Sequence, residues 1–424
     1  MNYGYLIGVL LHGALVLLTL TAPRRPRSLA HLGYRVAAAY NEVPFLFLYL
    51  LLASTIQTLA EGSFNSAADR VALSLGILVM AGLVLIVWRG ARARPLVEQA
   101  LEEGLGRDWR QELDPETASR LRNGPPLANV LFWPFVLRPR NVERVANISY
   151  GPAGRAHLLD LYRHASRPEG APVLVYFHGG GYRSGRKSFE ARALLFRLAS
   201  QGWVTVSANY RLRPDADFFD HLADAKRVIA WVREHGQEYG ADTSTLYLSG
   251  SSAGGHMSSI AALTQNDPRY QPGFEEADTS VTGVMSLYGW YGGYYGMGGA
   301  GSEVGPLGHD SREAPPFFIA HGVNDSLATV ETARRFVEHL REGSREPVVY
   351  AELPGAQHSF DLFHSLRFSA VVDGAEAFAA WVDRRRQDAA VPSVPNDAES
   401  MVSRSGSTGT NTVTSQAMAT MNST

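Results

Sequence analysis

Three long apolar stretches dominate the hydrophobic pattern of the amino-terminal quarter of the chain. Residues 5–22, 43–60 and 71–88 form 18-residue windows that contain no Asp, Glu, Lys or Arg. As a helix, each window would be about 27 Å long, close to the thickness of the hydrocarbon core of a bilayer. The pattern therefore predicts three transmembrane helices within a membrane region that covers residues 1–94.

Two other interpretations of these windows are weaker. A cleaved signal peptide would account for the first window alone, but residues 1–4 contain no basic residue and two more apolar windows follow. Three buried helices of a soluble domain would need a large partner core to cover them. We therefore favour a multi-pass membrane protein that has the lipid bilayer as a partner.

The arginines that flank these windows predict an orientation. Residues 23–42 contain four arginines, residues 61–70 contain one, and residues 89–94 contain three. The first and third groups are Arg24, Arg25, Arg27 and Arg35, and Arg89, Arg92 and Arg94. Because cytoplasmic loops carry the excess of basic residues, the amino terminus is predicted to lie outside and everything after Trp88 in the cytoplasm.

Residues 95–141 are predicted to form a helical linker or cap segment. Pro95–Arg122 has the pattern of two amphipathic helices that are interrupted at Pro115. The apolar stretch Leu127–Leu137 follows and is too short to span a bilayer. It packs either in the core or as an interfacial or active-site cap, and in the second case Phe132, Trp133 and Phe135 would bind substrate.

From residue 142 onward, strand and helix patterns alternate. The predicted strands are an opening hairpin at 142–150 and 156–163, then 173–177, 203–208, 246–249, 281–288, 317–320 and 348–353. The predicted helices are 222–235, a helix from 253, 329–342 and 368–385. This alternation predicts an α/β fold with a doubly wound, mainly parallel sheet over residues 142–386. The tail, residues 387–424, is rich in Ser, Thr and Asn and is predicted to be disordered.

Composition excludes several classes of chemistry. The chain has 39 basic and 41 acidic residues, a formal charge of −2, which gives no electrostatic reason to expect a nucleic-acid partner. It has no cysteine, so disulfides, thiol catalysis and cysteine-based metal sites are ruled out.

Two glycine-containing motifs follow predicted strands. His178-Gly179-Gly180-Gly181 comes after strand 173–177, where glycines allow backbone N–H groups to face a ligand without a Cβ in the way. Gly250-Ser251-Ser252-Ala253-Gly254 lies between strand 246–249 and the helix from residue 253. A nucleophilic serine on a sharp turn needs this strand–turn–helix context, which places Ser252 at the centre of the motif.

A serine hydroxyl becomes a useful nucleophile only when a base takes its proton. In chain order an acid and then a histidine should follow Ser252. Among Asp267, Asp278, Asp310 and Asp325, only the last comes directly after a predicted strand, in His-Gly-Val-Asn-Asp. Among His256, His309, His321, His339, His358 and His364, residue 358 follows the next strand on a glycine-containing loop. Both are expected at the carboxyl edge of the sheet, beside Ser252.

The order of these motifs resembles the α/β-hydrolase superfamily. More narrowly, the HGGG, GxSAGG and HGxxD segments and the late histidine resemble the hormone-sensitive-lipase-type esterases and their membrane-attached actinobacterial carboxylesterase relatives. The resemblance covers about Val142–Arg385, and 178–212 is especially close to the second group. One departure is Ser251, where the family often has an acidic residue before the nucleophile.

This resemblance implies an activity and roles for the residues. Ser252 would attack an ester carbonyl, His358 would take its proton, and Asp325 would orient His358. The N–H groups of Gly179 or Gly180 and of Ala253 would bind the oxyanion. A small-molecule or lipid ester is the expected substrate, with no metal or organic cofactor. An acyltransferase with the same triad and a non-catalytic membrane scaffold are the alternatives; acyl length, natural substrate and oligomeric state are left open.

Overall fold

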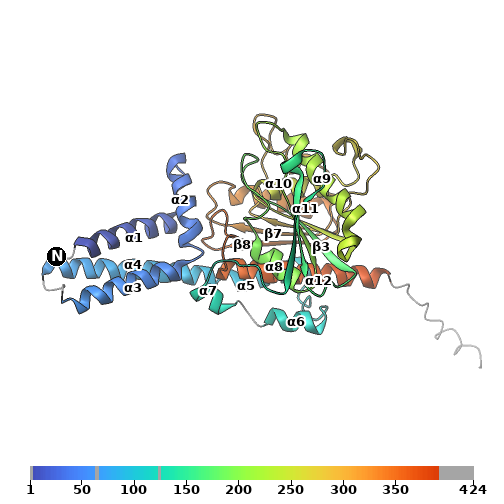
Figure 1. Ribbon diagram of the computed structural model, residues 1–424. Coiled ribbons are helices and arrows are strands. Elements are labelled where there is room, and N and C mark those ends of the chain that lie inside the picture. The colour runs from blue at the N-terminus through green and yellow to red at the C-terminus, as the bar shows by residue number, and fades with distance from the viewer. Residues whose placement is uncertain (1–2, 63–65, 123–125, 391–424) are drawn as a thin grey trace, which may run out of the picture. The chain divides into compact units, whose positions relative to one another are not determined.

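The computed structural model describes residues 3–62, 66–122 and 126–390 (Figure 1). The helices that precede the first strand are α1 (Tyr3–Thr21), α2 (Arg27–Tyr40), α3 (Pro44–Ala60), α4 (Ala67–Ala91), α5 (Ala93–Leu105), α6 (Pro115–Arg122) and α7 (Leu127–Phe132). The three apolar windows of the sequence coincide with α1, α3 and α4.

Two of these helical segments, α1 and the continuous α4–α5 unit, are long and apolar enough to cross a membrane. Helix α3 has 17 residues, and it meets the same criterion only together with α2, from which it is bent by 79°. The stretch after α1 thus contains the helix α2, whereas its four arginines were interpreted as part of a connecting loop. The apolar side chains of α2 recur along one face of the helix, and a count of arginines does not reveal this pattern.

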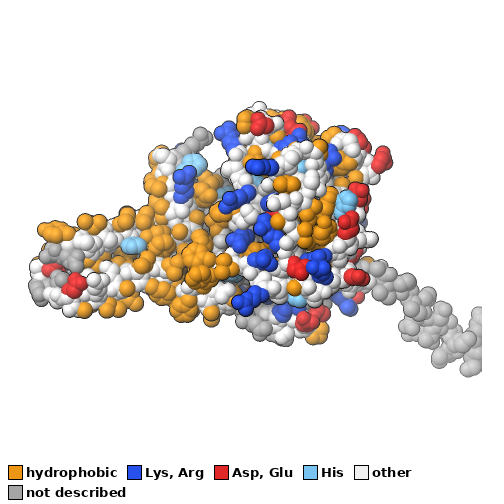
Figure 2. Space-filling view, in the orientation of Figure 1, with side chains coloured by type: hydrophobic (Ala, Val, Ile, Leu, Met, Phe, Trp, Pro, Cys, Tyr) orange, Lys and Arg blue, Asp and Glu red, His pale blue; other side chains and the backbone are white. Residues whose placement is uncertain are grey.

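The helices α1, α3 and α4 pack on one another and also present apolar side chains outward. Their shared core contains Val9, Leu51 and Leu83. Many outward residues are large, apolar and exposed, as Figure 2 shows in orange: Ile7, Leu10, Leu11, Leu17, Leu50, Leu52, Ile56, Ile77, Leu78 and Val84. Helices that are apolar all round and still exposed suit a lipid environment better than water.

Eight strands form one sheet within the described residues. They are β1 (Val142–Ser149), β2 (Leu158–His164), β3 (Ala171–Phe177), β4 (Val204–Ala208), β5 (Ala241–Ser251), β6 (Gly283–Leu287), β7 (Phe317–Gly322) and β8 (Val348–Leu353), in the order β1-β2-β4-β3-β5-β6-β7-β8. Strand β2 pairs antiparallel with both β1 and β4, and the pairs from β4 to β8 are parallel. The predicted hairpin and the mainly parallel sheet are both present.

Helices cover both faces of this sheet, as expected where parallel strands are apolar on both sides. The helices are α8 (Arg192–Ser200), α9 (Phe218–His235), α10 (Ala253–Leu263), α11 (Val330–Gly343) and α12 (Leu366–Ala390), with short 3₁₀ turns η1 (Gly154–His157), η2 (Gly236–Tyr239), η3 (Pro268–Tyr270) and η4 (Pro306–Gly308). Alternate residues of β3 join two different cores: Leu174 packs with α5, α8 and α12, and Val175 with α9, α10 and α11.

Helix α5 belongs to this layered fold, although the sequence suggested a linker. Its residues Val97, Ala100 and Leu101 are buried in the same core as Val349 of β8. The predicted disordered tail begins within α12, which continues to Ala390; the remainder of that tail, 391–424, lies outside the described residues.

The aromatic segment formed by Phe132, at the end of α7, and by Trp133 and Phe135 lies on the surface. Phe132, Trp133 and Phe135 are 69%, 56% and 49% exposed, so these three side chains do not pack in the core. The ring of Phe132 stacks beside Tyr49 of α3, with the centroids 6.4 Å apart. The exposed aromatic segment is thus continuous with the apolar helices.

Candidate active site

The nucleophile turn lies between β5 and α10. Ser252 has φ 54° and ψ −113°, a strained backbone for a residue with a side chain. A Cβ on Gly250 would lie 2.3 Å from the carbonyl carbon of Gly254, and a Cβ on Gly254 would lie 2.0 Å from the carbonyl oxygen of Phe177. Only glycine fits at these two positions, and the tight turn lifts the Ser252 hydroxyl out of the sheet edge.

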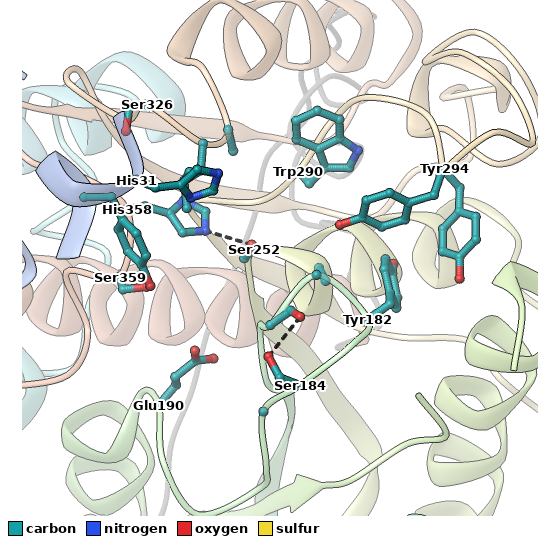
Figure 3. Close-up of a pocket in the computed structure, with 18 of the residues that line it drawn as sticks. His31, Tyr182, Ser184, Glu190, Ser252, Trp290, Tyr294, Ser326, His358 and Ser359 are labelled. Carbon is teal, nitrogen blue, oxygen red and sulfur yellow. Dashed lines mark hydrogen bonds between the residues drawn. The ribbon is translucent and has the colours of Figure 1, made fainter. Parts of the chain in front are cut away.

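Three side chains from separate loops meet at this edge. The Ser252 hydroxyl lies 2.8 Å from Nε2 of His358, and Nδ1 of His358 lies 2.7 Å from Oδ2 of Asp325 (Figure 3). Asp325 follows β7 and His358 follows β8, as the sequence predicted for the acid and the base. With Nδ1–H donated to Asp325, Nε2 is left to accept the serine proton.

Backbone contacts and burial fix the acid. The second oxygen of Asp325, Oδ1, accepts the N–H groups of Leu327 and Ala328, each at 2.8 Å. Burial opposes ionisation of Asp325, but the His358 charge and these hydrogen bonds leave the pKa of Asp325 below its usual value. Burial alone would lower the pKa of His358, but the Asp325 carboxylate, together with the Glu190 and Asp361 charges, raises it above its usual value.

The other acidic and histidine candidates have different surroundings. Asp310 is exposed and pairs with Arg312. His256 is buried, and its Nδ1 lies 2.7 Å from the Tyr182 hydroxyl. His321 is buried beneath Asp325 and donates to the carbonyl of Ala328. These three side chains therefore have hydrogen-bond partners other than Ser252.

The two predicted oxyanion elements flank Ser252. Ala253 is the first residue of α10, so its N–H has no acceptor within its own helix. The N–H of Gly179 donates to Glu190 Oε2 at 2.5 Å and is therefore engaged. Of the two glycines considered, Gly180, at φ 112°, is the one left to supply a second donor.

Glu190 begins a buried network that the sequence did not suggest. Its Oε2 also accepts the Tyr176 hydroxyl at 3.4 Å, although that hydroxyl is closer to the Ser251 oxygen, at 2.8 Å. Burial and the nearby Asp361 charge raise the pKa of Glu190 to about 7. By accepting the N–H of Gly179, the Glu190 carboxylate holds the loop that contains Gly179, Gly180 and Gly181, here called the glycine loop, in place.

Asp361 closes the other end of this network. Its carboxylate accepts the Ser251 hydroxyl at 2.7 Å and the Tyr288 hydroxyl at 2.6 Å. Burial raises the pKa of this carboxyl above its usual value. The family often has an acidic residue at position 251. Here that position is a serine, and its hydroxyl donates to an acidic residue from another part of the chain, Asp361.

A cavity of about 1280 Å³ opens above the triad. Its lining includes Ser252 and His358 together with Gly180, Gly181, Tyr182, Ser184, Phe189, Glu190, Ala253, Trp290, Tyr294, Tyr295 and Leu327, and the amino-terminal residues Arg24, Ala30, His31 and Tyr34. Figure 3 shows Trp290 and Tyr294 on one side of Ser252 and His31 on the other. The cavity suits a substrate with both apolar and polar parts.

The predicted cap residues are not part of this lining. Phe132, Trp133 and Phe135 are absent from the walls of this cavity, so the structure does not bring them to Ser252. The physical reason is the position of α7, which packs beside α3 and leaves these rings outward. Among the described residues, no group of three or more His, Asp or Glu side chains has an arrangement that could hold a metal ion.

Comparison with known proteins finds relatives among esterases. A family described as BD-FAE matches residues 159–292. The probable carboxylic ester hydrolase LipM of Mycobacterium tuberculosis (strain ATCC 25618 / H37Rv) is 39% identical over 337 residues, 71% of this chain and 75% of the relative. Esterase LipQ of the same organism is 34% identical over 328 residues, 71% and 78% of the two chains.

The chain belongs to the hormone-sensitive-lipase-type esterases. The α/β-hydrolase fold and the family resemblance predicted from the sequence are confirmed. Esterase LipC, also of M. tuberculosis, is 36% identical over 275 residues, 59% of this chain and 68% of the relative.

Sequence reasoning missed several residues of this esterase that line the cavity or support the glycine motif and the nucleophile turn. The residues Arg24, Ala30, His31 and Tyr34 precede the hydrolase fold, and no motif links them to it. Glu190 and Asp361 lie 11 residues after Gly179 and three after His358, a proximity that could have drawn attention.

We predict that Asp325→Asn shifts the acidic limb of the pH–activity profile to lower pH. The base acts only when neutral, so activity falls as pH drops through the raised pKa of His358. Removal of the Asp325 carboxylate removes the largest of the interactions that raise this pKa. Activity at the optimum should fall by about 10⁴-fold. kcat/KM for p-nitrophenyl butyrate between pH 5 and 9 checks this, with Asp310→Asn as the control. An unmoved limb with activity within tenfold would contradict the assignment.

We predict that Glu190→Gln stabilises the protein increasingly as pH rises from about 5 to 8. The native carboxyl keeps its proton to about pH 7, above its unfolded value, so the native state binds more protons in this window and loses stability as pH rises. A glutamine side chain does not titrate, so it adds no pH dependence to the stability. Melting temperatures of the full chain at both pH values check this, with exposed Glu313→Gln as the control. A difference in melting temperature between the variant and wild type that is the same at both pH values would refute this prediction.

Proposed function

We propose that the protein is a membrane-anchored serine carboxylesterase that cleaves carboxylic esters through an acyl-enzyme on Ser252. The observation that carries this proposal is the hydrogen-bonded chain from Ser252 through His358 to Asp325 beneath an open cavity. The names of the relatives LipM and LipQ, a probable carboxylic ester hydrolase and an esterase, support ester hydrolysis as the reaction.

The reaction begins when Ser252 Oγ attacks the ester carbonyl carbon and its proton moves to His358 Nε2. The carbonyl oxygen becomes an oxyanion, for which the N–H groups of Gly180 and Ala253 are the donors. The C–O bond to the alcohol then breaks, and His358 returns the proton to the leaving oxygen. Asp325 stabilises the histidine cation during both transfers.

Water completes the cycle. His358 takes a proton from a water molecule, whose oxygen attacks the acyl carbon on Ser252. The second tetrahedral species breaks to release the carboxylic acid, and the proton returns to Ser252. Loss of one oxyanion donor in enzymes of this type costs about 2.7–4 kcal/mol of transition-state stabilisation.

We predict that Ser252→Ala lowers kcat for short p-nitrophenyl esters by about 10⁶-fold, because loss of the nucleophile disables the triad as a unit. Labelling by a fluorophosphonate probe should disappear with it. The neighbouring Ser251→Ala is the comparison: that hydroxyl faces Asp361 and not His358, so its removal should reduce stability and leave labelling in place. Activity of Ser252→Ala above one-tenth of wild type would overturn the proposal.

We infer that α1, α3 and α4 anchor this esterase in a bilayer. Their outward apolar side chains support this, and Trp133 and Phe135 are aromatic residues of the type found at membrane interfaces. Phe132 lies beside Tyr49, about 7.5 Å along α3 from Pro44 at 1.5 Å per residue, a depth typical of an interface. The exposed aromatic segment thus rests at the surface of the membrane in this proposal.

The helix ends support the predicted cytoplasmic orientation of the catalytic fold. Arg89 at the end of α4 donates to the carbonyl of Leu20 near the end of α1, so both helices finish at the same level. Arg24 and Arg35 follow α1 in the chain, and Arg92 and Arg94 follow the end of α4. Because basic residues are enriched on the cytoplasmic side, these helix ends are proposed to lie there. Protease digestion of a carboxyl-terminal tag in inside-out but not right-side-out vesicles tests this orientation.

We predict that the full chain remains in the membrane pellet after washes with 1 M salt and with carbonate, and that detergent releases it. Salt at about 1 M reduces the Debye length to about 3 Å and weakens surface charge contacts, but it does not reverse burial in hydrocarbon. Immunoblots of pellet and supernatant check this. Release by salt alone would show that the apolar helices do not insert.

A further inference from the structure

Helix α2 lies between two membrane-anchor helices in the chain, yet it forms one wall of the active-site cavity. Ala30, His31 and Tyr34 line the cavity that contains Ser252. In Figure 3 the blue ribbon of the amino-terminal region carries His31 to the side of His358. The catalytic fold therefore does not enclose its own cavity; the anchor region completes it.

Direct contacts hold the middle of α2 on the catalytic loops. The ring of Tyr34 meets that of His358 edge-on, with centroids 5.8 Å apart and planes at 75°. The Tyr34 hydroxyl lies 3.3 Å from the Ser359 hydroxyl, and the Ser326 hydroxyl donates to the carbonyl of Ala30 at 3.3 Å. These partners follow β8 and β7, the strands that deliver the catalytic base and acid.

Ionic and polar contacts also fix α2 at its two ends. Before the helix, Arg24 pairs with Glu331 at 3.1 Å and donates to the carbonyl of Val323. After it, the Asn41 side-chain amide donates to the carbonyl of Gly355 at 3.0 Å. The position of α2 is thus defined at both ends and in the middle.

The strongest of these attachments is buried. Arg367 of α12 donates to the carbonyl of Asn41 at 2.6 Å and pairs with Glu42 at 3.3 Å. Both charged side chains are 1% exposed. Movement of α2 away from the catalytic fold would leave these charges buried without partners, which is costly, so the wall is held in place rather than loosely apposed.

We propose that α2 is a specificity-determining wall of the ester-binding cavity, in which His31 and Tyr34 contact the part of the substrate that extends from the scissile bond. This inference rests on the proposed esterase function. Because α2 connects the ends of α1 and α3, this wall lies at the membrane surface. The substrate class that fits is an amphiphilic ester whose apolar chain partitions into lipid.

The absence of native cysteine provides a clean test. A single cysteine is introduced as His31→Cys, and separately as Leu32→Cys, the adjacent exposed residue that does not line the cavity. Each full-length variant in lipid nanodiscs is treated with a benzyl methanethiosulfonate reagent, and kcat/KM for p-nitrophenyl octanoate is measured before treatment, after it, and after reduction.

We expect modification of the His31→Cys variant to lower kcat/KM at least tenfold and reductant to restore it, while the Leu32→Cys variant stays within twofold. Equal responses of the two variants, whether both unchanged or both reduced, would overturn the inference. The proposed function is judged separately, by whether the unmodified activity depends on Ser252. Loss of that dependence would refute the esterase mechanism, whatever the two cysteine variants show.

Substitution of Tyr34 gives a second, independent readout. Tyr34→Ala should raise KM for the octanoate ester at least fivefold and change KM for the acetate ester less than twofold, because only a long chain reaches the wall. Leu32→Ala is the control and should behave like wild type, since Leu32 is exposed and does not line the cavity. Equal changes for both esters in Tyr34→Ala would indicate a purely structural role and overturn the assignment.

Discussion

The strained turn at Ser252 is the constraint on which the rest of the site depends. A positive φ at a residue with a side chain persists only where the surroundings over-determine it. Here β5 pairs with β3 and β6, α10 packs below, and two glycines permit a contact that no Cβ would allow. The serine hydroxyl is therefore held within hydrogen-bond distance of His358.

Buried charge organises the surroundings of this turn. On one side, Asp325 is ionised because hydrogen bonds and the histidine compensate for its burial. On the other side, burial raises the pKa of both Glu190 and Asp361, and the Asp361 charge raises the pKa of Glu190 further. The same low-polarity setting thus produces one anion that supports the base and two carboxyls that hold the glycine loop and the nucleophile turn.

The connection between the apolar helices and the catalytic fold is more than a tether. The buried pair of Arg367 and Glu42, together with Tyr34 against His358, places residues from the amino-terminal helices beside the candidate active site. The cavity that contains Ser252 is therefore lined in part by α2, a helix that lies in the chain between the apolar helices α1 and α3.

The sequence by itself determined the α/β order, the apolar helices and the positions of Ser252, Asp325 and His358, because strand periodicity, turn glycines and chain order are local signals. Only the tertiary structure decided that α2 lines the cavity, that Phe132, Trp133 and Phe135 do not, and that Gly179 is occupied by Glu190. These outcomes depend on packing between segments about 11 to 325 residues apart, such as Tyr34 and Ser359. Local patterns carry no information about such pairings, because one amphipathic helix can cover a core, a cavity or a membrane surface equally well.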